Sequence, residues 1–239
     1  MPETELRLTF HQLLDDVHDD IVRLGQAVVE CVPRATRVLL DFDLEGADLL
    51  IRADDELDAR AIDAEELCLK LLALQQPMAG DLRSIVAALK IIGEMERSGD
   101  LAVNIAKGAR RIYGHPVDPK LRGVISRMAD QAQDLFSKAV DAYHSRDVAL
   151  AAALDDMDNL LDQLHREFIQ KIFESHAAGT IDIQVAIQLA VVARFYERIG
   201  DHAVNIGERV CYMVTGWMPE HTGAARYRAR EGARESDET

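Results

Sequence analysis

The segment Glu96-Arg-Ser-Gly-Asp-Leu-Ala-Val-Asn-Ile105 recurs in the second half of the chain as Glu197-Arg-Ile-Gly-Asp-His-Ala-Val-Asn-Ile206, and eight of the ten positions are identical. A second repeated pattern precedes each copy. In it, Asp54-Asp-Glu-Leu-Asp58 corresponds to Asp158-Asn-Leu-Leu-Asp162, with an acid, two variable residues, Leu and a second acid. The two motifs occur in the same order in both halves, which predicts a chain built from two structural repeats.

The boundary between the repeats falls near residue 117. The stretch Tyr113-Gly-His-Pro-Val-Asp118-Pro119 ends one helix and begins another, with Asp at the N-cap and Pro in the first turn. We therefore expect a first repeat over residues 1–115 and a second over 118–217. Residues 218–239 mix charges with Gly, Ala and Ser and have almost no apolar periodicity, so we expect a charged, disordered tail.

The composition favours helices, because 48% of the residues are apolar but only 5% are aromatic, and Gly and Pro are few. Apolar residues recur with a period near 3.6 in six segments. The predicted helices cover residues 5–42, with a kink at Pro33, and residues 45–75, 81–113, 119–145, 148–177 and 181–216. The expected fold class is all-α, with two tandem pseudo-symmetric three-helix bundles.

The formal net charge of −15 argues against nucleic acid and anionic lipid as partners, since both require a basic surface. No apolar run reaches the ~18 residues of a membrane-spanning helix, and the beginning of the chain lacks the pattern of a signal peptide. The cysteines Cys31, Cys68 and Cys211 form no C-x-x-C spacing and lie among apolar residues, where free thiols pack as small hydrophobic groups. We expect a cytoplasmic protein.

The repeated motifs place pairs of acids four residues apart, on one face of each helix. Such like-charge pairs destabilise a helix by about 0.2–0.5 kcal/mol unless something neutralises them. A solvated acidic face is one interpretation, but Glu96 falls inside the apolar stripe that contains Leu89 and Ile92. A carboxylate at the edge of a core must be protonated, paired with a cation such as Arg, or bound to a metal ion.

If the acidic faces of the second and third helices of each repeat meet, their carboxylates and one asparagine amide oxygen converge. Such oxygen-rich sites suit Mg²⁺, Ca²⁺, Mn²⁺ or iron with bridging carboxylates, whereas Zn²⁺ fits less well without thiolate or imidazole ligands. A structural polar network is the alternative. The candidate metal ligands are Asp54, Asp58, Glu96, Asp100 and Asn104 in the first repeat, and Asp158, Asp162, Glu197, Asp201 and Asn205 in the second.

Two histidines lie close to these acids in the sequence. His202 follows Asp201, but its counterpart in the first repeat is Leu101 and adjacent residues point in different directions, so we expect it to pack or to form a hydrogen bond. His165 shares a helix face with Asp162 and could reach the acids. The arginines that follow the motif glutamates should point toward a neighbouring helix or solvent.

The duplicated Glu-Arg-x-Gly-Asp-x-Ala-Val-Asn-Ile segment resembles the PhoU family over roughly residues 5–216. Arg194-Phe-Tyr before the second copy and Gln76-Pro-Met-Ala-Gly-Asp-Leu-Arg83 before the first belong to the same resemblance. It implies paired three-helix bundles that bind multinuclear iron or other divalent metals, with the motif acids as ligands. Asn159, where an acid is common, and the tail beyond Pro219 depart from the pattern.

The same resemblance implies a regulatory role. PhoU-like proteins are expected to be homodimers that link the ATPase subunit of the phosphate ABC transporter to a sensor histidine kinase. When phosphate is plentiful, this adaptor would hold phosphate uptake and the phosphate-starvation response off. The resemblance predicts a negative regulator rather than an enzyme.

Two other functions share the expected fold. A carboxylate-bridged di-iron enzyme needs Glu-x-x-His pairs on two helices, and no Glu in this chain has His three residues later. The sequence also lacks a phosphate-binding P-loop, a nucleophile elbow and a dinucleotide fingerprint. A helical scaffold or metal store without a regulatory role remains the alternative.

Overall fold

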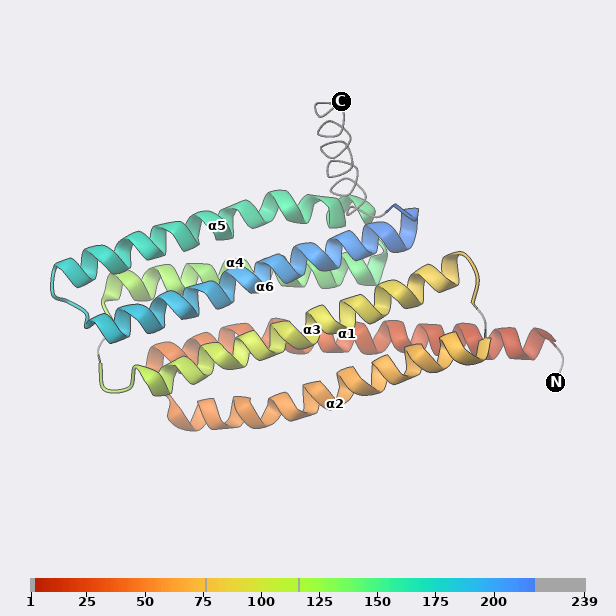
Figure 1. Cartoon of the computed structure of the whole chain (residues 1–239), viewed down its shortest axis with the longest axis horizontal. Helices are drawn as coiled ribbons and strands as arrows, with labels where there is room; N and C mark the ends of the chain where they lie inside the picture. Colours follow the sequence, from red (N-terminus) through yellow and green to blue (C-terminus); the bar gives the residue numbers. More distant parts are fainter. Residues whose placement is uncertain (1–2, 76, 116, 218–239) are drawn as a thin grey trace, which may run out of the picture.

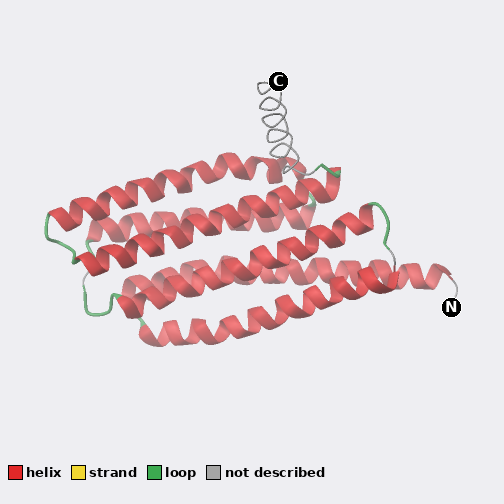
Figure 2. Ribbon diagram, in the orientation of Figure 1, coloured by secondary structure: helices red, strands yellow, loops and turns green. Residues whose placement is uncertain are grey.

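The computed structural model describes residues 3–75, 77–115 and 117–217, and this part of the chain contains six helices and no strand (Figure 2). The helices are α1 Glu3–Asp41, α2 Leu44–Gln75, α3 Gly80–Arg111, α4 Pro119–Ser145, α5 Val148–Ala177 and α6 Ile183–Thr215. Every end lies within two residues of its predicted position, so the all-α fold is confirmed. Helix α1 continues through Pro33, and the predicted kink there stays a prediction. The predicted tail, 218–239, lies outside the described residues.

Three helices of the second repeat begin at aspartate N-caps. The carboxylates of Asp118, Asp147 and Asp182 accept hydrogen bonds from backbone N–H groups two or three residues later. These bonds satisfy donors that have no partner inside the helix. Gly179, between α5 and α6, has a left-handed backbone conformation with φ 72°. Glycine adopts this conformation at little cost, because it has no Cβ atom. The N-cap predicted at Asp118 and the break predicted between residues 177 and 181 are therefore present.

The two repeats form two layers that lie side by side (Figure 1). Helices α1, α2 and α3 make one layer and α4, α5 and α6 the other. The layers meet where α3 packs against α6 and α1 packs against α4. Within the described residues α2 contacts only α1 and α3, and α5 contacts only α4 and α6. The second helix of each repeat is thus the outer one, and the third is central.

One continuous cluster of buried apolar side chains includes residues from all six helices. Tyr196 on α6 is completely buried, and its hydroxyl forms a 2.7 Å hydrogen bond with the hydroxyl of Thr36 on α1, in the other repeat. Burial of apolar surface stabilises by about 25 cal/mol per Å². Since that surface is shared between the repeats, they are packed as a single unit around one core.

The cysteines pack as the sequence predicts. Cys68 is buried, Cys31 and Cys211 are half-buried, and all three are free thiols. Among the helices of the described residues, none has both the length and the apolar character that crossing a membrane requires.

Candidate metal-binding seams

The acids of the first repeat lie where α2 packs against α3. Burial raises the pKa of Asp54 to about 6, and the nearby carboxylates of Asp58 and Asp100 add to the shift. Burial likewise raises the pKa of Asp58, and Asp100 again adds to it. The pKa of Glu96 is raised by burial first and then by Asp100 and Asp58. Because these carboxylates affect one another across the helix pair, the structure brings all four together in one seam.

The acids of the second repeat lie in the equivalent seam between α5 and α6. Burial raises the pKa of Asp158 to about 6, with Asp162 and Asp201 adding to the shift. In the described part of the chain, the Oδ1 atom of Asp158 is buried without a hydrogen-bond partner. A Cβ atom at Gly200 would lie only 2.4 Å from this oxygen. The glycine of the repeated motif therefore lets α6 approach the carboxylate.

Arginine distinguishes the two seams. Arg194 forms an ion pair with Glu197, one turn further along α6, and its guanidinium lies 4.0 Å from Asp201. Arg166 lies 3.8 Å from Asp162. No acid of the first seam forms an ion pair with Lys or Arg within the residues that the structure describes. Of the alternatives that the sequence left open, an ion pair with a cationic side chain is thus present in the second seam. In the first seam Lys107 and Arg97 only oppose the rise in the pKa of Asp54 and Glu96.

The two asparagines lie beside the acids. Asn205 lines a shallow hollow together with Asp158 and Asp201, and Asn104 is half-buried one turn after the last acid of the first motif. Amide oxygens are acceptable ligands for hard cations. His165 is half-buried as well; burial and a neighbouring arginine lower its pKa.

The donor chemistry of both seams fits a hard divalent cation, which prefers carboxylate and amide oxygens. The unpartnered buried oxygen of Asp158 and the bare backbone of Gly200 opposite it are features that a cation would satisfy. Across residues 3–75, 77–115 and 117–217, no three His, Cys, Asp or Glu side chains already converge as ligands of one ion. Side-chain rotation is therefore needed before these carboxylates can share a cation.

A separate polar cluster lies between the repeats, where α3 meets α6. His202 is buried, and its Nδ1 atom lies 2.9 Å from Oγ of Ser98, so the predicted hydrogen-bonding role is confirmed. Burial lowers the pKa of His202, whereas the carboxylate of Glu94, 3.9 Å from Nε2, opposes that shift. Glu94 also pairs with Arg97 at 2.8 Å. Arg97 thus binds an acid on its own helix, not on a neighbouring one.

Sequence reasoning overlooked Glu94, whose side chain is only 11% exposed. A signal was present, because Glu94 falls three and seven residues after the apolar Ile91 and Ala87, at the spacing of one buried stripe. In the second repeat the equivalents of Glu94 and Ser98 are Phe195 and Ile199. The polar cluster therefore occurs in one copy of the interface only.

Comparisons with known proteins match most of the chain. A family model described as the PhoU domain matches residues 21–109 and 125–210. The phosphate-specific transport system accessory protein PhoU homolog 1 of Mycobacterium tuberculosis strain H37Rv is 35% identical over 223 residues, which are 93% of this chain and 100% of that protein. PhoU homolog 2 of the same strain is 32% identical over 215 residues, 90% of this chain and 100% of the relative.

Solved structures share the fold. The crystal structure of PhoU from Pseudomonas aeruginosa superposes with a TM-score of 0.81 and 29% identity, covering 87% of this chain and 100% of that one. The phosphate transport system regulatory protein PhoU from Streptococcus pneumoniae gives a TM-score of 0.80, at 24% identity, over 87% of this chain and 98% of that one. The second likeness shows the fold alone.

We expect Asp158→Asn to stabilise the metal-free protein at pH 7. The folded pKa of about 6 exceeds the ordinary value of 3.8, so the folded state holds the proton more tightly than the unfolded state. The contribution of Asp158 to stability is therefore complete below pH 3.8 and is lost as the pH rises through 6. The shift corresponds to about 3 kcal/mol at most, which we reduce to about 1 kcal/mol because the carboxylate is only half-buried.

Urea unfolding in a chelating buffer, from acid to neutral pH, measures this effect. Asp156→Asn, an exposed acid on the same helix, is the matched control and should leave the profile unchanged. Equal stabilities of Asp158→Asn and the unmodified protein at pH 7 would contradict the prediction.

Proposed function

This chain belongs to the PhoU family, and from that membership we propose that it is an accessory protein of a phosphate-specific transport system that represses phosphate uptake and the phosphate-starvation response. The observation that carries the proposal is the similarity along both repeats to proteins named as accessory to phosphate-specific transport. A regulatory protein, not an enzyme, fits the absence of catalytic motifs from the sequence.

The protein acts as a cytoplasmic adaptor. Its partners are the ATPase subunit of the phosphate ABC transporter and the phosphate-sensing histidine kinase, which it couples when phosphate is plentiful. Long exposed faces on the outer helices α2 and α5 support this role, since no other helix of the described residues covers either face. The formal charge of −15 suits basic patches on protein partners and disfavours nucleic acid and insertion into anionic membranes.

Divalent or iron-type metal ions regulate the adaptor surface by occupying the two seams. Carboxylates from two helices would hold the ion, and its positive charge would neutralise the half-buried carboxylates. Without a cation, repulsion between the acids weakens the attachment of α2 to α3 and of α5 to α6. With that repulsion removed, the outer helices present a fixed surface to partners. Fe, Mn, Mg and Ca suit these ligands better than Zn.

A variant without the four acids of the central helices should lose its metal. Replacing these residues by Ala removes ligands from both seams, so elemental analysis of the purified protein should find less than a tenth of the metal bound by the unmodified chain. The residues replaced are Glu96, Asp100, Glu197 and Asp201.

The matched control replaces four exposed acids that lie outside both seams, namely Asp63, Glu66, Asp130 and Asp156. It changes the net charge equally and should retain the full metal content. Full metal content in the seam variant would remove the ligand assignment, and equal losses in both variants would attribute the metal to general charge attraction.

Deletion of the gene should switch on a phosphatase reporter of the phosphate-starvation response in phosphate-rich medium. Restoring the unmodified gene should switch the reporter off. Restoring the seam variant tests whether the metal acids are needed, and we expect repression to be lost. A reporter that stays off after deletion would contradict the regulatory proposal and favour the metal-storing scaffold.

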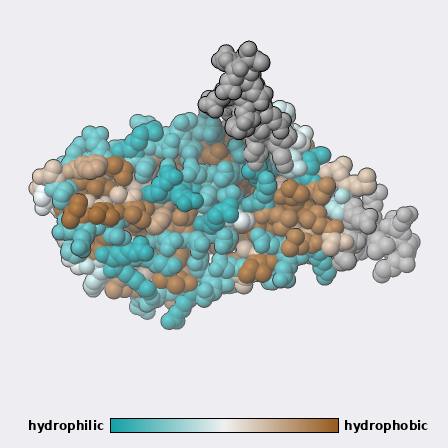
Figure 3. Space-filling view, in the orientation of Figure 1, coloured by the Kyte–Doolittle hydropathy of each residue, from teal (hydrophilic) through white to brown (hydrophobic). Residues whose placement is uncertain are grey.

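The protein forms a homodimer through an apolar patch at the turn between α5 and α6. Figure 3 shows hydrophobic residues gathered over the first turns of α6. Phe173, Ile183 and Ile187 are 70%, 51% and 54% exposed, and groups of this kind mark protein interfaces. Ile183 and Ile187 lie one turn apart on α6, so their side chains are neighbours on one face of the helix.

Light scattering should therefore give twice the 26.6 kDa mass of one chain. Phe173→Lys with Ile187→Lys should give the single mass, because two buried ammonium groups would be unpaired in the interface. Ile62→Lys, at an exposed apolar position on α2, should leave the dimer intact. A single-chain mass for the unmodified protein would exclude the dimer.

A further inference from the structure

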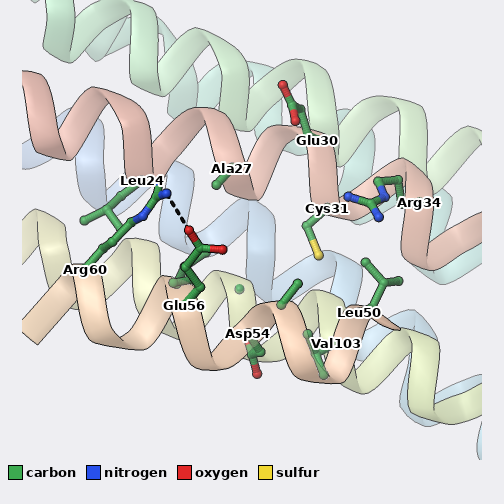
Figure 4. A pocket seen from close by; sticks show the side chains of 13 residues that line it. Leu24, Ala27, Glu30, Cys31, Arg34, Leu50, Asp54, Glu56, Arg60 and Val103 are labelled. Atoms are coloured by element: carbon green, nitrogen blue, oxygen red, sulfur yellow. Dashed lines mark hydrogen bonds and ion pairs between the residues drawn. The ribbon is translucent and has the colours of Figure 1, made fainter. Parts of the chain in front are cut away.

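A cavity of about 170 Å³ lies between α1 and α2, with α3 as its floor. Its walls are the apolar side chains of Leu24, Leu50, Leu57 and Val103, which are all buried. Figure 4 shows the Sγ atom of Cys31 pointing from α1 into the space between the helices. An apolar cavity of ~150 Å³ is large enough for benzene. This cavity therefore accommodates an apolar group of about the size of one aromatic ring.

The cavity adjoins the metal-binding seam and shares Asp54 with it. Figure 4 shows the carboxylate of Asp54 pointing away from α1, on the far side of α2. Arg34 and Arg60 stand at opposite ends of the opening in the same view. Arg60 is bonded to Glu56 at 2.6 Å, whereas Arg34 forms no ion pair within the described residues. Glu30, one turn before Arg34, also lines the cavity, but no ion pair joins the two side chains in the described residues, so the guanidinium of Arg34 keeps its N–H donors available.

The second repeat shows that the cavity is not a necessary result of the fold. Phe42 and Arg146, at φ 56° and 55°, mark equivalent positions after α1 and α4, so that residue n of the first two helices corresponds to n + 104. Ala27 and Ala53 then correspond to Gln131 and Met157. Nε2 of Gln131 donates to the carbonyl oxygen of Met157 at 3.4 Å, across the space that the two alanines leave open.

The other equivalent positions differ in the same direction. Cys31 corresponds to Leu135, which is completely buried. Arg34 corresponds to Lys138, which forms an ion pair with Asp134. The second and third helices also pack more closely in the second repeat. A Cβ atom at Gly200 would lie 2.7 Å from the Leu161 side chain, whereas one at the equivalent Gly99 would lie 3.2 Å from Leu57. The second repeat therefore closes the space and pairs its cation with Asp134. In the first repeat the space is open, and Arg34 forms no ion pair with Glu30, the equivalent of Asp134, within the described residues.

We propose that the α1–α2 cavity of the first repeat binds a small organic anion, with an apolar group of about one aromatic ring between Leu24, Leu50 and Val103 and a carboxylate on the guanidinium of Arg34. The guanidinium offers paired N–H donors to a carboxylate. A second hollow, whose charged lining residues are Arg34, Arg37, Asp41 and Asp43, adjoins the cavity at this end. It leaves room for the carboxylate to lie outside the apolar space.

The test uses 3-phenylpropionate as the probe and the full chain in isothermal titration calorimetry. The neutral analogue 3-phenylpropanol should bind at least tenfold more weakly, a difference of about 1.4 kcal/mol. Arg34→Gln should reduce the affinity for the carboxylate to that of the alcohol. Arg52→Gln, an exposed arginine elsewhere on α2, is the matched control and should bind normally. Equal affinity for the two probes would overturn the assignment of Arg34.

Ala27→Gln with Ala53→Met introduces the residues of the second repeat and should abolish binding by filling the cavity. A readout on the unmodified protein does not depend on how these variants fold. The probe should slow alkylation of Cys31 by N-ethylmaleimide at least fivefold, measured by mass spectrometry, and leave the half-buried Cys211 unaffected. Binding without protection of Cys31, or no binding at all, would overturn the proposal.

Discussion

Helix α3 is buried against α6 on one side and against α2 on another, and this double burial decides where its charged residues lie. The equivalent α6 is enclosed in the same way by α3 and α5. The motif carboxylates of both helices therefore lie along the edges that the outer helices approach. There they are only partly removed from water, which raises the pKa of Asp54 and Asp158 and makes each seam a region of unfavourable negative charge.

The seams have the same backbone arrangement but different charged side chains around them. In the second seam Arg194 and Arg166 lie close to three of the four acids. In the first seam the nearest motif arginine, Arg97, is engaged by Glu94 at the interface between the repeats. Lys107 and Arg97 still oppose the rise in the pKa of Asp54 and Glu96. The two seams therefore differ in whether a cationic side chain contacts the acids directly or acts on them from a distance.

Pseudo-symmetry holds for helix lengths and turns but not for side-chain chemistry. The interface between the repeats places Glu94, Ser98 and His202 together, while the equivalent positions are apolar. The cavity of the first repeat is the same kind of difference, since small side chains there replace the larger ones that fill the second repeat. At these asymmetric sites the molecule can have functions that two identical repeats would lack.

The sequence by itself determined the six helices, their caps and breaks, and the acids that face each other within each repeat. These features follow from periodicity, from N-cap chemistry and from the repeated motif, which are local properties of the chain. Only the tertiary structure decided that the repeats share one core, that Glu94 is the most buried carboxylate of α3, and that Arg194 belongs to the second seam. It also decided that α1 and α2 enclose a cavity. Each of these depends on which face of one helix meets another across the molecule, and helical periodicity specifies an apolar face without specifying its partner.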